Sequence, residues 1–376
     1  MLECTRFIGP YFAQVENKAQ GKQQVGSQQS QRLKWKKPGL ALSGFLLFTL
    51  ALGLMKEGAG ELAPLLGGHL EITNGADSLG FGWLTAYLVL SGSPVAAAAV
   101  ALLSADALSP LNAFTMVAGS RLGASFIVLL AGFIYALRGH ERWTALTAGV
   151  LSLLLTSSVQ LLALPMGLLI LGQGWLNHLS LPALEKLAAG VNRGLEPLIG
   201  PLAAFLPGWA LFVVGVVLVT LSFRLFDQAL PQVRLEKTDL GQIPRLIYRP
   251  EVMFLMGLVI TLLTMSVSIS VGILVPLSAR GYMRRENIIP YILGANISTL
   301  ADTLVAAALL GAPRAVTVVV THMACATIVS LPLILLAYRP YERAISNALA
   351  WITRRRRNFA LFVGVIFVVP VILVLL

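Results

Sequence analysis

Seven long apolar segments constrain this chain more than any other feature. Each is long enough to cross about 30 Å of hydrocarbon as a helix. Only 12% of the 376 residues are charged, against about 25% in a typical soluble domain. The chain is therefore predicted to be an all-α polytopic membrane protein, with spans near residues 39–56, 109–137, 143–172, 199–225, 286–311, 314–338 and 358–376.

Two further apolar segments, residues 79–105 and 251–279, are interrupted near their middle by small hydroxylated residues. The interruptions read Ser91-Gly92-Ser93-Pro94 and Ser266-Val267-Ser268-Ile269-Ser270. A helix broken inside a membrane is tolerated where its freed backbone groups line a cavity or bind something. We therefore expect each segment to form a re-entrant helical hairpin that enters and leaves on one side.

The placement of basic residues favours re-entry over spanning. If the N-terminus is cytoplasmic and both interrupted segments re-enter, all the strongly basic loops fall on the cytoplasmic side, as the positive-inside rule requires. If both segments span instead, Arg138, Arg142 and the basic loop 224–249 move outside. The first hairpin is then expected to enter from outside and the second from the cytoplasm.

These expectations divide the chain into five parts. Residues 1–38 are expected to be a disordered, basic cytoplasmic tail, since their charges directly precede an apolar segment and no cleavage site follows. Residues 39–172 and 251–338 form two membrane repeats. Residues 173–250 hold an extracytoplasmic segment, a transmembrane helix and a cytoplasmic loop, and residues 339–376 a basic loop and a final helix. The expected location is the cell (inner) membrane.

The two interrupted segments have the same spacing to a later glycine-rich stretch. Leu90-Ser91-Gly92-Ser93 is followed after 29 residues by a stretch starting at Gly119, and Met265-Ser266-Val267-Ser268 after 29 by one starting at Gly294. Small residues also pack membrane helices together, but two copies at equal spacing favour two inverted repeats. Half-helix N-termini favour anions and freed carbonyls favour cations, so the pattern predicts a site for an anion and a coupling cation.

The segment Gly294-Ala295-Asn296-Ile297-Ser298-Thr299 resembles the Gly-Ala-Asn-Ile-Gly-Thr-Thr stretch of the type II sodium/phosphate cotransporter family. That family also carries Gln-Ser-Ser-Ser at each hairpin, and the similarity covers residues 40–138 and 250–338. The resemblance implies phosphate as substrate, sodium as the coupling ion and no other cofactor. Carried over by position, it implies binding residues at Ser91, Ser93, Ser266, Ser268, Gly119, Gly123, Gly294, Asn296 and Thr299.

The departures from the family pattern fall on the polar positions. Leu90 and Met265 stand at both glutamine positions, and Arg121 stands where the first repeat should have asparagine. A cation at the bilayer centre costs about 2.5–3.5 kcal/mol on insertion scales, so Arg121 needs a partner. The partner is either an anionic substrate or Asp302. The candidate ion-coupling residues are Thr299, Ser125, Ser298 and Asp302.

Other polar residues within the predicted spans suggest contacts between helices. Gln160 with Thr156, Ser157 and Ser158 forms a polar patch, for which interhelical hydrogen bonding is the expected role. His322 is expected either to hydrogen-bond a backbone carbonyl or to relay protons.

The leading functional hypothesis is a sodium-coupled symporter for phosphate or a related anion, working by alternating access. Two alternatives stay open: a non-transporting membrane scaffold with degenerate ion sites, and a proton-coupled transporter of another small anion. The sequence carries no His/Cys metal cluster and no Gly-x-Ser-x-Gly motif, so an enzyme is not expected. The basic residues form no face for nucleic acid. An oligomer is possible.

Overall fold

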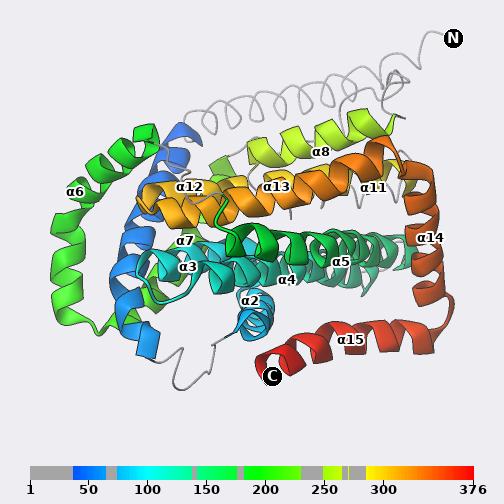
Figure 1. Ribbon diagram of the computed structural model, residues 1–376, viewed down its shortest axis with the longest axis horizontal. Helices are drawn as coiled ribbons and strands as arrows, with labels where there is room; N and C mark the ends of the chain where they lie inside the picture. The colour runs from blue at the N-terminus through cyan, green and yellow to red at the C-terminus, as the bar shows by residue number, and fades with distance from the viewer. Residues whose placement is uncertain are drawn as a thin grey trace, which may run out of the picture.

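Every described element of the protein is a helix in the computed structural model (Figure 1). The structure describes residues 37–64, 74–137, 142–175, 182–229, 249–264, 270 and 285–376. Within these ranges seven helices are long and apolar enough to cross a membrane, which confirms the predicted all-α membrane class. They are Lys37–Pro64, Pro110–Leu130, Leu146–Gly172, Gly208–Ala229, Asn287–Leu309, Pro313–Leu335 and Arg356–Val374.

Some expectations fall on residues outside these ranges and stay predictions. They concern the N-terminal tail up to residue 36, the cytoplasmic loop 230–248, and most of the second hairpin. Among the candidate binding residues, Ser266 and Ser268 lie outside the described residues.

The first interrupted segment folds as two short helices, α2 (Gly75–Val89) and α3 (Gly92–Ser104). Leu90 ends α2 in the left-handed conformation, with φ 53°, and Ser91 is extended at the start of α3. A non-glycine residue with positive φ is uncommon and stops a helix. The interruption therefore lies where the sequence predicted it.

These two helices run in opposite directions along α4 (Pro110–Leu137). Gly75 lies next to Thr115 and Gly123 next to Ala86, so α2 runs parallel to α4. At the start of α3, Gly92 lies against the middle of α4, and the chain then returns to the N-terminus of α4. Helices α2 and α3 thus form a hairpin whose turn lies beside the middle of α4.

The second half of the chain repeats this helix pair 175 residues later. Helix α8 (Pro250–Thr264) matches α2 residue for residue in its bounds, and α11 (Arg285–Ser298) begins 175 residues after α4. The close contacts also correspond. A Cβ on Gly119 would lie 2.9 Å from the amide nitrogen of Trp83, and one on Gly294 would lie 2.9 Å from that of Leu258. The equal spacing noted in the sequence therefore reflects two equally packed helix pairs.

The two pairs differ where α4 continues and α11 stops. Helix α4 passes through residues 124–125 without a break. Helix α11 ends at Ser298, two residues form a turn, and α12 (Ala301–Leu309) starts again. Of the two helices that follow a hairpin segment, only the second is broken in the described part of the chain.

Helices α5 (Arg142–Gly172) and α13 (Pro313–Leu335) lie beside α4 and α11 and complete the central group of helices (Figure 1). The core is divided into two apolar clusters, one around α3 and α12 and the other around α5 and α11. Helix α15 (Arg356–Val374) packs on α2.

Two segments outside the predicted spans contain a helix. Residues 339–357, expected as a basic loop, largely form α14 (Tyr338–Arg354), which crosses the ends of the central helices (Figure 1). Its buried face follows a helical spacing through Ile345, Leu349 and Ile352. The segment expected outside the membrane contains most of α6 (Pro182–Phe205). The predicted span 199–225 instead begins at α7 (Gly208–Ala229), because Pro207 separates the two helices.

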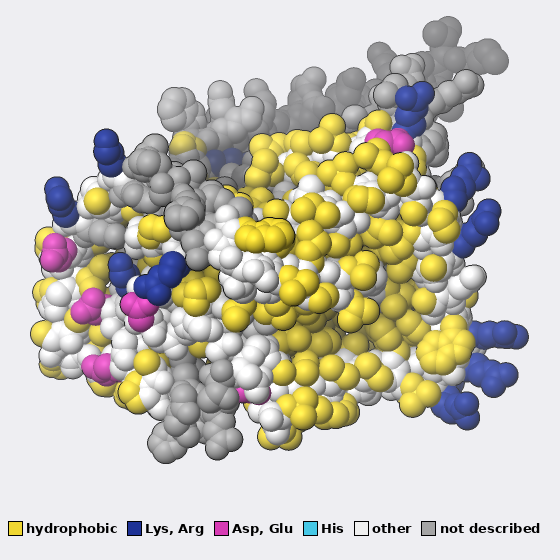
Figure 2. All heavy atoms as spheres, in the orientation of Figure 1, with side chains coloured by type: hydrophobic (Ala, Val, Ile, Leu, Met, Phe, Trp, Pro, Cys, Tyr) yellow, Lys and Arg dark blue, Asp and Glu magenta, His cyan; other side chains and the backbone are white. Residues whose placement is uncertain are grey.

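The two ends of the molecule differ in charge (Figure 2). Along the edge formed by α14 and the start of α15, the exposed charged side chains are arginines, including the run 354–357. At the opposite end, basic and acidic side chains are mixed, and Arg314 pairs with Asp106 at 2.7 Å.

Candidate functional site

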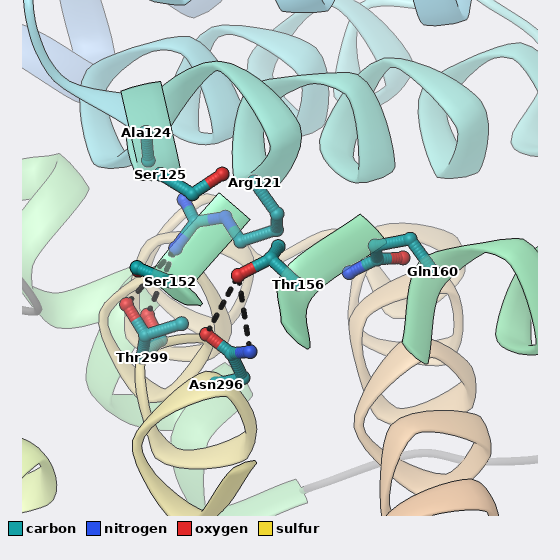
Figure 3. Close-up of a pocket in the computed structure, with 8 residues that line it drawn as sticks. All are labelled: Arg121, Ala124, Ser125, Ser152, Thr156, Gln160, Asn296 and Thr299. Carbon is teal, nitrogen blue, oxygen red and sulfur yellow. Dashed lines mark hydrogen bonds between the residues drawn. The ribbon is translucent and has the colours of Figure 1, made fainter. Parts of the chain in front are cut away.

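A small polar cavity lies where the two repeated helix pairs meet (Figure 3). Its free space is about that of one water molecule. The lining comes from α4, α5, α11 and the turn after α11. The lining residues are Arg121, Ala124, Ser125, Ser152, Thr156, Gln160, Asn296 and Thr299.

The lining includes corresponding positions of the two repeats. Arg121 and Asn296 are 175 residues apart, as are Ala124 and Thr299. The same face of the two equivalent helices therefore points into one cavity. At the first of these pairs of positions, one residue is a cation and the other an amide.

Arg121 is the charged group of the cavity, and its side chain is only 5% exposed. Its Nη1 donates to the Thr299 hydroxyl at 3.1 Å and to the Thr299 carbonyl at 3.4 Å, and its Nε donates to the Ser120 hydroxyl at 3.3 Å. Its Nη2 has no hydrogen-bond partner among the described residues. An unpaired donor on a buried charged group is costly, so Nη2 is the point at which this site lacks an acceptor.

Glycine at position 92 makes room for this arrangement. A Cβ there would lie 2.8 Å from the Ala124 Cβ and 3.4 Å from Arg121 Nη2. The absence of a side chain at position 92 thus allows the hairpin turn to approach α4 next to the guanidinium.

Asp302 lies one turn beyond Thr299, at the start of α12, and is 3% exposed. Its Oδ1 accepts from the backbone N–H and, at 2.9 Å, from the hydroxyl of Thr303. The Ser93 hydroxyl, at the start of α3, also hydrogen-bonds this carboxyl group. Oδ2 has no partner in the part of the chain that the structure describes.

Arg121 and Asp302 do not form a salt bridge within the described residues. Their charges nevertheless act on each other through the protein interior. The expectation of Asp302 as the direct partner of Arg121 is therefore not met in this conformation. Among the described residues, Arg121 Nη2 has no acceptor and Asp302 Oδ2 has no donor.

Helix α5 supplies the third wall through Ser152, Thr156 and Gln160, which are spaced four residues apart on one face. Asn296 Nδ2 donates to the Thr156 hydroxyl at 3.1 Å. The Gln160 Oε1 lies 3.1 Å from His322 Nε2 on α13.

The polar patch of α5 thus connects α5 to three other helices. Besides the bonds to α11 and α13, the Ser158 hydroxyl lies 2.7 Å from the Tyr341 hydroxyl of α14. The predicted interhelical hydrogen bonding of this patch is confirmed, and the partner of His322 is a side chain rather than a backbone carbonyl. Ser152 was missed, although its four-residue spacing from Thr156 and Gln160 was a signal for it.

The other predicted residues separate into those at the cavity and those that pack helices. Ser125 lines the cavity, and its hydroxyl donates to the Leu122 carbonyl at 2.7 Å. Ser298 is buried and bonds within its own helix, to the carbonyls of Gly294 and Ala295 at 3.4 Å. Gly119 and Gly294 lie at the contacts with α2 and α8, and Gly123 also faces α2. Ser91 is half-buried at the start of α3.

The donors of the cavity suit an anion better than a metal ion. A guanidinium, hydroxyls and amides surround it, and no group of three or more His, Cys, Asp or Glu side chains arranged for a metal occurs among the described residues. A guanidinium donates to two oxygens of a phosphate or carboxylate in a fixed geometry. Comparisons with protein-family models, with curated proteins and with solved structures gave no match for this chain.

Proposed function

We propose that this protein is a secondary transporter of a small oxyanion, with inorganic phosphate as the first candidate. The observation that carries the proposal is the Nη2 group of Arg121, which is buried beside the cavity without an acceptor among the described residues. Buried charges in membrane proteins mark substrate and ion pathways more often than they serve packing.

The surroundings of Arg121 favour an anion of the phosphate type. The hydroxyls of Ser125, Ser152 and Thr156 and the amide of Gln160 line the same cavity. Hydroxyls can donate to a phosphate oxygen and accept from a protonated one. One anion accepting from Nη2 and from these groups would supply the missing acceptor.

The repeated helix pairs support transport by alternating access. In this proposal the two repeats are inverted, and the hairpin of α2 and α3 is re-entrant. Sites between such repeats lie near the midplane and open to either side as one repeat moves against the other. The free space equals about one water, which is too small for a phosphate, so in this proposal the anion enters when the helices separate.

The charge at the two ends supports an orientation. The arginine-rich end at α14 faces the cytoplasm under the positive-inside rule, and the mixed end with Asp106 and Arg314 faces outward. In this proposal the N-terminus of the first helix lies in the cytoplasm. The protein is placed in the cell membrane, and a cation gradient, of sodium or protons, drives uptake.

The experiment is uptake of labelled phosphate, and of labelled sulfate in parallel, into proteoliposomes with an imposed sodium or proton gradient. Uptake that depends on a gradient in wild type and is lost in Arg121→Gln supports the proposal. Arg193→Gln is the matched control, since Arg193 is an exposed arginine of α6. If none of several oxyanions is taken up under either gradient, the proposal is wrong.

One observation favours a second candidate, a membrane scaffold that kept the fold without transport. Leu90, which stands where the family pattern has glutamine, is 53% exposed and forms the hairpin turn, so it offers no polar group there. A scaffold predicts that Arg121→Gln leaves the cellular phenotype unchanged at equal expression.

A further inference from the structure

We infer that Asp302 is the group whose protonation couples anion movement to a proton gradient. The inference rests on the proposed function, because it names the driving ion for the anion site around Arg121. It depends on how these two buried charges are arranged and on which of their atoms lack partners.

Arg121 and Asp302 come from opposite repeats and are both almost fully buried, at 5% and 3% exposed. Each carries one polar atom, Nη2 and Oδ2, without a partner among the described residues. They are close enough for their charges to interact, yet they form no salt bridge. Among the described residues, Asp302 is the opposite charge that acts on Arg121, and Arg121 is the one that acts on Asp302.

Among the described residues, Arg121 is the cation whose charge acts on Asp302. Helix α3 brings only the Ser93 hydroxyl, and α13 brings His322, which is already bonded to Gln160. Lys56 of the first helix reaches the far end of α12, where its Nζ donates to the Leu310 carbonyl at 3.2 Å. Among the other described charged side chains of the packed helices, Lys186, Arg193 and Glu196 are exposed, and Arg314 is bonded to Asp106.

An anion bound to Arg121 changes this balance. With the guanidinium neutralised by the anion, the Asp302 carboxylate would be an uncompensated buried negative charge. A buried ionised carboxylate without a counter-charge is so unfavourable that it takes up a proton instead. A monovalent anion and one proton therefore enter together, and the net charge of the site stays at zero before and after.

Release follows the same relation in reverse. When the site opens to the other side and the anion leaves, Arg121 is again free to compensate Asp302, and the proton is lost. Neither the anion alone nor the proton alone gives a neutral occluded site. Symport of anion and proton is thus the consequence of placing one cation and one carboxyl group within one dry site.

The test is accumulation of labelled phosphate in proteoliposomes at a fixed external pH of about 6.5, with the internal pH either equal or higher. Holding the external pH fixed keeps the phosphate species outside the same in both arms. Wild type is expected to accumulate about tenfold more of the monovalent phosphate species for each pH unit of gradient, and more label in total because part of the phosphate inside then loses a second proton. Sodium is absent from both sides in this arm and is added in a parallel one.

The decisive variant is Asp302→Asn, which imitates the protonated carboxyl group. It is expected to retain exchange of labelled for unlabelled phosphate and to lose the pH-driven accumulation. Asp302→Glu keeps a titratable group and is expected to retain pH-driven accumulation. Asp106→Asn, at an exposed aspartate, serves as the control and is expected to behave as wild type.

Other outcomes overturn the inference in distinguishable ways. If wild type accumulates phosphate only with a sodium gradient, or if Asp302→Asn still accumulates it with the pH gradient, Asp302 is not the coupling group, while the proposed function stands. If Asp302→Asn does not fold, Asp302→Glu provides the test. A folded Asp302→Glu protein that shows no pH-driven accumulation overturns the inference as well. If wild type neither accumulates nor exchanges phosphate or sulfate, the proposed function itself fails, and this inference falls with it.

Discussion

The two repeated helix pairs share their packing and differ in the chemistry that they bring to the cavity. In the first, α4 is continuous and presents Arg121. In the second, a turn separates α11 from α12, and the helix presents Asn296 and Thr299, while Asp302 is buried one turn further on. The glycine contacts that hold α2 on α4 and α8 on α11 are the same in both.

This difference shows that the scaffold and the site are specified by different positions. The shared glycines set how closely the helices approach, and they tolerate no side chain. The positions between them can change from asparagine to arginine without changing the helix pair. In this protein the two repeats therefore bring different groups, a guanidinium from the first and a carboxyl group from the second.

The largest effect is expected where the two repeats are alike. Gly119→Val and Gly294→Val would each push a side chain into the backbone of the facing helix, and overpacking costs about 1–3 kcal/mol or more. We expect similar and large losses of thermal stability in detergent for both variants. Gly190→Val is the control, because a Cβ on Gly190 meets no atom within 4 Å. A large loss in only one repeat would contradict equal packing.

The next effect is expected where the repeats differ. Arg121→Asn gives the first repeat an amide at the position where the second repeat has one, and it removes the only charge that lines the described cavity. It also removes the hydrogen bonds to Thr299 and Ser120, and a bond from a charged group contributes about 1.5–3 kcal/mol, so we expect lower stability and no thermal stabilisation by phosphate or sulfate. Arg121→Lys keeps the positive charge but not the planar guanidinium, and it is expected to retain part of the thermal stabilisation by anions. Unchanged stabilisation by anions in Arg121→Asn would show that the anion binds elsewhere.

A smaller effect is expected from the amide of the second repeat. Asn296→Ala removes the bond from Nδ2 to the Thr156 hydroxyl, and one such bond contributes about 1 kcal/mol. A double-mutant cycle with Thr156→Ala should give a coupling energy of about 0.5–1.5 kcal/mol. Additive losses would mean that the bond contributes nothing to stability.

The smallest effect is expected outside the repeats. Tyr341→Phe removes the hydroxyl that joins α14 to Ser158 of α5, at 2.7 Å, and should cost about 0.5–1.5 kcal/mol. Anion-dependent stabilisation should be unchanged, as measured by the same thermal assay. A loss of anion response in this variant would indicate that α14 takes part in the site.

The seven spans and the break at Ser91 could be predicted because apolar length and small hydroxylated residues are local signals. The correspondence of the two halves of the chain could be predicted from equal spacing alone. Arg121 stood out because a cation within an apolar helix is rare.

Other features depended on contacts that a single sequence does not contain. Helix α14 was taken for a loop because its arginines hid the helical spacing of Ile345, Leu349 and Ile352. The break after α11 has no glycine or proline to mark it. The separation of Arg121 from Asp302 depends on where two distant helices place their side chains.

The most direct test of alternating access at this cavity is labelling of Ser152→Cys from each side of the membrane. Ser152 lines the cavity and is buried, and Cys4 and Cys325 would first be replaced by alanine. We expect a membrane-impermeant thiol reagent to modify Cys at this position slowly from either side, and phosphate to slow the reaction from both. Labelling from one side only, or labelling that phosphate does not change, would contradict a shared anion site that opens alternately to each side.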